Sequence, residues 1–513
     1  MKTLASYVLG RWHAPEGDTR TVVDPSTEEP LAELGTGGID FGAVLAHARD
    51  NGGPALRALG FPARGELLAA LAGAIHEHRE ELIDLSLVCA GTTRGDAKFD
   101  LDGATGTLAA YAHFAKTIES EGFLVDGEGI QLGRTARFWG QHILVPRRGA
   151  AVHVNAFNFP AWNMAEKMAC ALLAGVPVVE KPGTPTAMLA WRLAQVIVTS
   201  GLLPEGAFQF LCGGAGDLVD RLGPQDVLAF TGSSGTGALL RGNPSVLRHN
   251  CHVNVEADSI NAAVLAPDVE RDSETYALFL ANVELDLRQK TGQKCTAVRR
   301  VLVPKEQVEA VGADLALSLG RIVVGDPRDK ATTMGPLASA DALAGVRAGI
   351  RALSAVGEIL CGGPEPVRER GYFVAPTLVL AREPEADVIH EREVFGPVAT
   401  LVPYDGEATE AARLVNRGGG GLVASVYSND RSWTEEVVLA ISPWHGRVWI
   451  GSDKVAEQAM APGMVLPASQ HGGPGRAGGG RELGGLRGLE PYLQRTALQG
   501  FQGLLTTAFG SRS

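Results

Sequence analysis

Hydrophobic and polar positions alternate with two different periods in the first part of the chain. From 63 to 87, Leu, Ile and Ala recur at helical spacing among Arg, Glu and His, which predicts one long amphipathic helix. From 127 to 148, apolar residues alternate with polar ones around Gly and Arg, which predicts an extended hairpin. A helical layer and a β-hairpin are therefore expected before residue 150.

Short apolar runs alternate with helical stretches from 150 to 256. A second region of this kind covers about 261–455, and a glycine-rich loop at 471–487 leads to a last extended stretch near 490–503. Such alternation predicts an α/β fold in which helices cover both faces of parallel sheets. In the first region we expect strands at 151–154, 176–179, 208–211, 227–230 and 253–255, and helices at 162–174 and 186–199.

Composition and charge exclude several classes of protein. A chain of 513 residues is too long for one hydrophobic core, so we expect two or three domains. A net charge of −12 without any Lys/Arg block argues against a nucleic-acid partner. No apolar run reaches the roughly 18 residues that span a bilayer, and the stretch before Arg11 is too short for a signal peptide. We therefore expect a cytoplasmic protein that binds neither nucleic acid nor membrane.

Cysteine usage points to one residue. Six cysteines in a chain of this length argue against a disulfide framework. Cys295 differs from an isolated cysteine because Gly292, Gln293 and Lys294 precede it and small residues follow. A nucleophilic thiol needs room for a substrate, backbone amides near developing negative charge, and positive charge that favours the thiolate. The alternative is a partly buried structural cysteine. We predict no metal site.

Polar residues follow the predicted parallel strands, at the sheet edge where such folds bind ligands. Asn158 lies where a strand ends and a helix opens, so its amide can stabilise an oxyanion or can simply cap the helix. Lys181 ends the next strand and can bind a sugar hydroxyl or a phosphate, or can be a solvated lysine. Glu256 follows the strand at 253–255, where its carboxylate can act as a general base.

Two further segments have the composition of cofactor-binding turns. Phe230, Gly232 and Ser233 belong to a strand that runs into a Gly/Ser turn and a helix, an arrangement suited to pyrophosphate, although Gly/Ser turns are common. Glu393 and Phe395 precede a Gly-Pro turn. The carboxylate there can accept hydrogen bonds from ribose hydroxyls or can face water.

The order of these segments resembles that of the aldehyde dehydrogenase superfamily, and the resemblance extends from about residue 5 to 500. It implies a Rossmann-like cofactor domain, an α/β catalytic domain and a small oligomerisation element. A homodimer, or alternatively a tetramer, is the implied assembly. The implied boundaries are 1–126 with 149–260 for the cofactor domain, 261–455 for the catalytic domain, and 127–148 with 488–505 for the oligomerisation element.

The resemblance implies catalytic roles for five residues. Cys295 is the nucleophile and Glu256 the general base. The Asn158 amide and the Cys295 backbone N–H form the oxyanion hole. Lys167 and Glu482 match a family pair that passes protons outward from the base.

It also implies a cofactor site. Lys181 and Glu393 hold the two riboses, and Phe395 packs by the nicotinamide. Ser233 holds the pyrophosphate, in the turn that Phe230 and Gly232 begin.

Three departures from the family pattern change this picture. Glu256 is followed by Ala-Asp-Ser-Ile in place of Leu-Gly-Gly-Lys, and Gly451 stands where the family usually has asparagine. Thr184 stands where NAD-preferring members place a glutamate that binds the adenosine 2′-hydroxyl, and no acid follows before Glu205. Because a carboxylate repels a 2′-phosphate and a threonine can donate to it, we predict NADP as the cofactor, with NAD used less efficiently.

Two segments, 155–163 and 471–486, resemble the dehydrogenase portion of bacterial enzymes that degrade aromatic acids as CoA thioesters. Some of those enzymes carry a fused hydratase domain, and we expect the stand-alone kind here. The implied substrate is a CoA-linked semialdehyde, 3,4-dehydroadipyl-CoA semialdehyde, in aerobic benzoate degradation. The alternatives are another semialdehyde or an aliphatic aldehyde, a CoA-acylating dehydrogenase, which the presence of Glu256 argues against, and a non-catalytic protein on the same fold.

Overall fold

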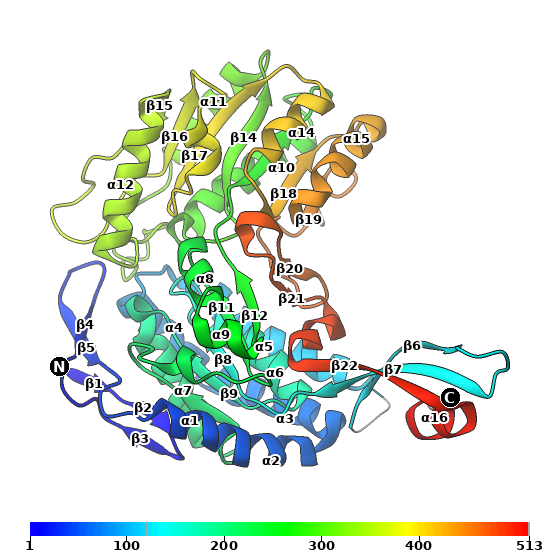
Figure 1. Ribbon diagram of the computed structural model, residues 1–513. Coiled ribbons are helices and arrows are strands. Elements are labelled where there is room, and N and C mark those ends of the chain that lie inside the picture. The colour runs from blue at the N-terminus through cyan, green and yellow to red at the C-terminus, as the bar shows by residue number, and fades with distance from the viewer. Residues whose placement is uncertain (119–121, 511–513) are drawn as a thin grey trace.

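Two seven-stranded sheets lie in separate parts of the molecule, the first in the lower half and the second in the upper half of Figure 1. The computed structural model describes residues 1–118 and 122–510. The first sheet has the order β12-β11-β8-β9-β10-β2-β3, in which β8 to β12 are parallel and β2 and β3 form an antiparallel edge. Its strands are β2 (Ser6–Val8), β3 (Arg11–His13), β8 (Ala151–Val154), β9 (Val178–Lys181), β10 (Phe208–Phe210), β11 (Val227–Thr231) and β12 (His252–Glu256).

The winding of this sheet reverses between β8 and β11, which are neighbours although β9 and β10 lie between them in the sequence. Ligands of open α/β sheets bind at the carboxyl ends of the strands, beside such a reversal. The five strands predicted in this region are all present, and helix α6 (Trp162–Ala174) has the predicted bounds. The α/β fold class is thus confirmed, and the segments that follow β8 and β11 lie at the ligand-binding edge.

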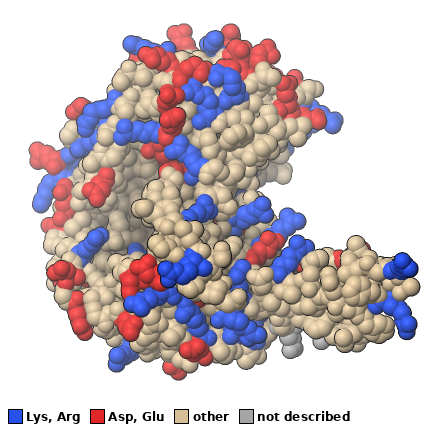
Figure 2. All heavy atoms as spheres, in the orientation of Figure 1, with Lys and Arg blue, Asp and Glu red and all other residues tan. Residues whose placement is uncertain are grey.

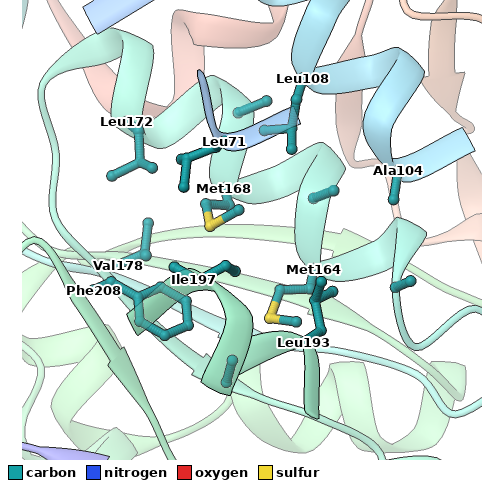
Figure 3. Close-up of a cluster of buried hydrophobic side chains, with 14 of the residues drawn as sticks. Leu71, Ala104, Leu108, Met164, Met168, Leu172, Val178, Leu193, Ile197 and Phe208 are labelled. Atoms are coloured by element: carbon teal, nitrogen blue, oxygen red, sulfur yellow. The ribbon is translucent and has the colours of Figure 1, made fainter. Parts of the chain in front are cut away.

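Helices cover both faces of the first sheet. On one face, Figure 3 shows Met164 and Met168 of α6 among Leu71, Val178 and Phe208, in a cluster of buried apolar side chains. The helices of that face are α3 (Gly60–Glu77), α4 (Arg79–Cys89), α5 (Arg94–Ala115), α6 and α7 (Ala187–Ser200). The opposite face carries α1 (Phe41–His47), the 3₁₀ helix η3 (Leu218–Arg221) and α9 (Pro244–His249).

The prediction of one long helix over 63–87 was wrong. The helix breaks at His78, whose backbone (φ −97°, ψ 9°) is not helical, and continues as α4 in a new direction. The break lets Leu82 and Ile83 of α4 turn into the core that α3 already lines. Helical periodicity extends across the break because both helices bury one apolar face, so the pattern alone does not reveal it.

The second sheet has the order β15-β16-β17-β14-β13-β18-β19, and it is parallel except for the edge strand β15. Buried apolar side chains fill both of its faces. Its strands are β13 (Asn261–Leu265), β14 (Val298–Pro304), β15 (Gly357–Cys361), β16 (Thr377–Ala381), β17 (Val398–Tyr404), β18 (Gly421–Tyr427) and β19 (His445–Gly451). Its helices are α10 (Glu274–Arg288) and α11 (Val308–Leu319) on one face, and α12 (Ala340–Ser354), α14 (Ala408–Asn416) and α15 (Arg431–Ile441) on the other.

The predicted hairpin and the last strand join in a third sheet that projects from the body of the molecule (Figure 1). It pairs β6 (Leu124–Gln131) with β7 (Phe138–Pro146), and β7 with β22 (Leu493–Phe501). Helix α16 (Gln502–Phe509), which the sequence did not predict, follows β22.

The segment 471–487, predicted as a loop, contains two short strands. β20 (Gln470–Gly472) and β21 (Arg481–Leu483) are antiparallel, with His471 opposite Glu482. The other elements are β1 (Lys2–Leu4), β4 (Arg20–Val23), β5 (Pro30–Leu34), α2 (Gly53–Ala58), α8 (Ser234–Arg241), α13 (Asp387–Glu391) and the short helices η1 (Ala48–Gly52), η2 (Thr184–Thr186), η4 (Gln289–Gly292), η5 (Ser442–Trp444), η6 (Gly475–Ala477) and η7 (Gly485–Tyr492).

Within 1–118 and 122–510, no single helix has the length and apolar character of a membrane span. One bent pair, Phe41–Ala58 with Gly60–Glu77, meets those criteria only when its two parts are taken together.

Replacing Met168 by Ala tests the core of the first sheet. Met168 is fully buried among the side chains of Figure 3, so the change leaves a cavity and lowers the free energy of unfolding by about 2–5 kcal/mol. Urea unfolding followed by tryptophan fluorescence measures it. The matched control is Met460→Ala at an exposed position, expected within about 0.5 kcal/mol of wild type. Equal urea midpoints for the Met168→Ala and Met460→Ala variants contradict the burial of Met168 in this core.

Candidate active site

A cavity of about 630 Å³ opens at the reversal point of the first sheet, where segments after β8, β11 and β12 face loops of the second sheet. Its lining brings together residues that are far apart in the sequence. Those that the sequence singled out are Asn158, Phe230, Gly232, Ser233, Glu256, Cys295, Glu393 and Phe395. The other four candidates, Lys167, Lys181, Thr184 and Glu482, are not among its lining residues.

The loop before Cys295 is held in an unusual backbone conformation. Lys290 and Thr291 both have φ of +55°, a region that side chains other than glycine rarely adopt. The Thr291 hydroxyl donates to the Gly335 carbonyl at 3.0 Å, which helps to hold the turn. Gly292 follows with φ +65°, and a Cβ there would lie 2.3 Å from the carbonyl oxygen of Gly396. Only glycine fits between the Cys295 loop and that carbonyl.

Lys294 does not face the sulfur, contrary to the expectation that a neighbouring cation favours the thiolate. Its buried ammonium donates to Asp286 Oδ1 at 2.7 Å and to Gln289 Oε1 at 2.9 Å. Lys294 therefore anchors the loop to helix α10. Burial, followed by the nearby charge of Glu256, raises the pKa of the Cys295 thiol well above its usual value.

Arg299 joins the Cys295 loop to the segment with Glu393 and Phe395. Its buried guanidinium donates to the carbonyl oxygens of Gly396 at 2.8 Å, Gly292 at 2.9 Å and Lys294 at 3.0 Å. The same group lies 3.8 Å from the Glu393 carboxylate and 5.5 Å from the centre of the Phe395 ring. Burial raises the pKa of Glu393 to about 7, although Arg299 opposes this shift.

Asn158 lies beside the Cys295 loop. Its side-chain N–H donates to the Gln293 carbonyl at 2.9 Å, and both Asn158 and Cys295 line the cavity. The other side of the loop is fixed by Asn261, whose amide donates to the carbonyls of Cys295 at 2.7 Å and Ala297 at 2.9 Å. These contacts orient an amide donor and the backbone around the sulfur, the arrangement that stabilises an oxyanion.

Glu256 is almost completely buried next to Cys295 and His471. The Nε2 atom of His471 lies 3.5 Å from Glu256 Oε1. Burial alone raises the pKa of Glu256, but the His471 imidazolium and the Lys167 ammonium reverse this and hold it below its usual range. The carboxylate is therefore the ionised form in which a general base must act.

Lys167 connects Glu256 to two further buried carboxylates. Its ammonium lies 3.3 Å from Glu166 and 3.4 Å from Glu482. Carboxylate oxygens of Glu166, Glu256 and Glu482 lie within 4.8 Å of one another. The pKa of Glu166 is raised to about 7, chiefly because the carboxyl is buried. Asn254 donates to Glu482 at 3.1 Å and lines a separate cavity, so the buried chain reaches toward solvent there.

Lys181 is the last residue of β9 and Thr184 is the first of η2, and Gly183 between them lines the cavity. Burial lowers the pKa of Lys181, and the charge of Arg20 on β4 lowers it further while the Cys212 thiol opposes the shift. Ser233 is the N-cap of α8, where its hydroxyl accepts from the backbone N–H of Thr236. Its position on the cavity wall leaves it beside any phosphate that enters.

Two of the departures from the family pattern have structural reasons. Asp258 accepts from the backbone N–H of Ser234 at 3.1 Å and from its hydroxyl at 2.5 Å, which ties the loop after Glu256 to helix α8. A Cβ on Gly451 would lie 2.6 Å from the Trp449 ring, so an asparagine needs that ring to move.

Sequence reasoning missed four residues of this site: Glu166, His471, Arg299 and Arg20. Glu166 precedes Lys167 on α6, and that adjacency was an available signal. His471 and Arg20 gave no such signal, because they lie far in the sequence from the other site residues. Arg299 gave none because it belongs to β14, whose sequence is that of an ordinary buried strand.

Comparisons with known proteins agree with this geometry. Residues 12–498 match the aldehyde dehydrogenase family. A 3,4-dehydroadipyl-CoA semialdehyde dehydrogenase from Aromatoleum evansii is 42% identical over 478 residues, which are 92% of this chain and 93% of that protein. A putative aldehyde dehydrogenase from Staphylococcus saprophyticus is 26% identical over 507 residues, 96% of this chain and 98% of the other.

Solved structures share the fold. Lactaldehyde dehydrogenase from Escherichia coli superposes with a TM-score of 0.85 at 24% identity, covering 96% of this chain and 98% of that one. Betaine aldehyde dehydrogenase from Staphylococcus aureus, solved with NAD⁺, gives 0.84 at 22% identity and covers 100% of both chains. With a family match over nearly its whole length, and with Cys295, a buried carboxylate and an amide gathered at the sheet edge, this chain belongs to the aldehyde dehydrogenase family.

Proposed function

We propose that this protein oxidises a CoA-linked semialdehyde to the carboxylic acid with NADP, through a thiohemiacetal and a thioester on Cys295. The observation that carries the proposal is the convergence of Cys295, Glu256 and Asn158 on one cavity. The substrate class is supported by the 42% identity to a protein named for 3,4-dehydroadipyl-CoA semialdehyde. We infer benzoate degradation as the setting for the same reason.

The first step in this proposal is addition of the Cys295 sulfur to the aldehyde carbon. Because the buried thiol resists ionisation, its proton must leave as the bond forms, and the Glu256 carboxylate is the neighbouring acceptor. The Asn158 amide and the Cys295 backbone N–H then donate to the oxyanion. Collapse of this thiohemiacetal with loss of hydride leaves a thioester on Cys295.

In the second step Glu256 takes a proton from water, which attacks the thioester and releases the acid. Glu166, Lys167 and Glu482 form a buried chain of ionisable groups beside the base, toward the cavity that Asn254 lines. We propose that they pass the proton outward. The presence of this base favours hydrolysis over transfer of the acyl group to CoA.

The residues around the cavity fit a nicotinamide dinucleotide, which when bound accepts the hydride. Glu393 has a buried Oε1 atom without a hydrogen-bond partner among the described residues, suited to a ribose hydroxyl. Phe395 packs edge-on against Phe157 at 5.9 Å between ring centres and gives a flat apolar wall. We propose that Ser233, with Gly232 and Phe230, receives the pyrophosphate and that the part of the chain around the first sheet, 1–126 and 149–260, is the cofactor domain, with 261–455 as the catalytic domain.

NADP is proposed over NAD because of the charges near Lys181. The Arg20 guanidinium is close enough to lower the pKa of that lysine, and no carboxylate is among the groups that shift it. Two cations and the Thr184 hydroxyl are suited to a 2′-phosphate, which a carboxylate at position 184 would repel.

The projecting sheet supports a homodimer as the assembly. Figure 2 shows that its surface is largely uncharged, and it exposes large apolar side chains, as monomeric proteins seldom do. Those side chains are Ile130, Leu132, Phe138, Phe501 and Leu504. All six cysteines are free, which supports a cytoplasmic location, where thiols stay reduced.

Glu256→Gln separates the two steps. Removing the carboxylate deprives water of its base, so steady-state turnover is expected to fall by about 10²–10⁴-fold. The thiol loses a neighbouring charge that raises its pKa, so a pre-steady-state burst of NADPH should remain. Stopped-flow absorbance measures both. Cys295→Ala is the control and should show neither burst nor turnover. Loss of the burst in the glutamine variant contradicts the expectation that Glu256 is needed chiefly for deacylation.

Thr184→Glu tests the cofactor proposal. Wild type is expected to use NADP with a kcat/KM at least about tenfold above that for NAD, which corresponds to about 1.4 kcal/mol. A carboxylate at 184 should remove most of that preference. Arg20→Ala should also reduce the preference, by lowering kcat/KM for NADP while leaving kcat/KM for NAD unchanged. The matched control is Thr199→Glu at the exposed end of α7. Equal use of both cofactors by wild type, or no response to the change at 184, contradicts the proposal.

Phe501→Asp tests the assembly. Wild type should have a solution mass of about twice 53.7 kDa by light scattering, and the charge on β22 should shift it toward the monomer. Leu317→Asp, on the exposed face of α11, is the control that should leave the mass unchanged. A monomeric wild type, or a dimeric Phe501→Asp variant, argues against this interface.

A further inference from the structure

Three side chains of metal-ligand chemistry meet beside the active-site cavity, which two of them, Glu256 and Cys295, line. Glu256 ends β12, Cys295 follows the strained loop, and His471 comes from β20 in the glycine-rich tail. One ligand atom of each, a carboxylate oxygen, the sulfur and a ring nitrogen, lies within 4.8 Å of the other two. The sequence gives no sign of this set, because its members belong to three distant segments.

The surroundings of Glu256 point to a ligand. Glu256 is 1% and His471 4% exposed, so both are shielded from bulk water. Neither carboxylate oxygen of Glu256 has a hydrogen-bond partner among the described residues, although buried carboxylates are normally bonded. The oxygen nearest to His471 is 3.5 Å from its ring nitrogen. Glu256 and Cys295 also line the cavity, which gives an ion a path in and room for a water molecule.

We propose that Glu256, Cys295 and His471 form a reversible Zn²⁺ site, and that zinc bound there inhibits the enzyme. Thiolate, imidazole and carboxylate are the protein ligands of zinc, and three of them with one water complete its usual tetrahedron. Thiolate and carboxylate together neutralise the charge of the ion. On binding, the S–H bond of Cys295 and the Nε2–H bond of the protonated His471 break, S–Zn and N–Zn bonds form, and two protons pass to solvent. No electron is transferred.

Inhibition follows from which atoms the ion occupies. Zinc takes the sulfur that must attack the aldehyde and the carboxylate that must activate water. The site goes beyond the proposed reaction, because neither the aldehyde nor the cofactor takes part in it. His471 distinguishes it from zinc binding to a lone reactive thiol, since His471 supplies the third ligand.

The experiment measures binding and inhibition separately on the full-length chain. Cd²⁺ is titrated into the protein, and thiolate-to-cadmium charge-transfer absorption in the ultraviolet reports binding at Cys295. Cys295→Ser gives the background of the other five cysteines. His471→Gln should weaken binding by at least about tenfold, because losing a direct ligand costs no less than losing an outer-shell contact. Zn²⁺ inhibition of the oxidation rate, reversed by a chelator, should weaken by a similar factor, each variant being referred to its own metal-free rate.

His249→Gln is the matched control, since His249 is exposed at the end of α9, and it should bind and respond like wild type. Equal cadmium midpoints for wild type and His471→Gln overturn the proposal, whatever the enzyme oxidises. If His471→Gln fails to fold by circular dichroism, Glu256→Gln takes its place in the cadmium titration with the same expectation. Cadmium absorption of wild type no greater than that of Cys295→Ser overturns the proposal as well.

Discussion

The active site depends on one buried cation, the guanidinium of Arg299. It donates to three backbone carbonyls, two in the Cys295 loop and one in the turn after Phe395. The planar fork of arginine can reach three acceptors at once, and a lysine ammonium on a flexible stem cannot hold them in one plane. Without Arg299 the three buried carbonyls lose charge-assisted bonds, each worth about 1.5–3 kcal/mol. The proposed nucleophile, Cys295, and the proposed cofactor wall are thus positioned by the same side chain.

A second constraint is charge balance behind Glu256. Three buried carboxylates, those of Glu166, Glu256 and Glu482, gather around the cations Lys167 and His471. One negative charge is left over, and an uncompensated charge in a buried site is costly. Burial raises the pKa of Glu166 to about 7, so this carboxyl takes up a proton more readily than an exposed glutamate. A cluster near neutrality that holds an exchangeable proton is suited to a base that must recover its own ionised form after each turnover.

The sequence predicted what local pattern and motif order determine. Helix α6 was predicted with its observed bounds because a mostly apolar segment of helical length lies between two short apolar runs that form strands. The break at His78 was missed because packing against the core, and no local signal, ends α3. Likewise the composition around Cys295 indicated a cation, but only the structure shows that Lys294 points to Asp286. Side-chain direction in a strained loop is decided by tertiary partners that the sequence does not identify.

The glycines of segment 471–487 let the tail of the chain pack against the end of β12. Gly480 donates to the Val255 carbonyl at 2.9 Å, and Ala257 donates to the Ala477 carbonyl at 3.0 Å, so the tail lies directly against the end of β12. A Cβ on Gly480 would come within 2.3 Å of the Val255 oxygen, which only glycine avoids. This close approach brings β20 and β21, with His471 and Glu482, to Glu256, the proposed general base. The glycine-rich segment is therefore the backbone requirement for closing the site around Glu256.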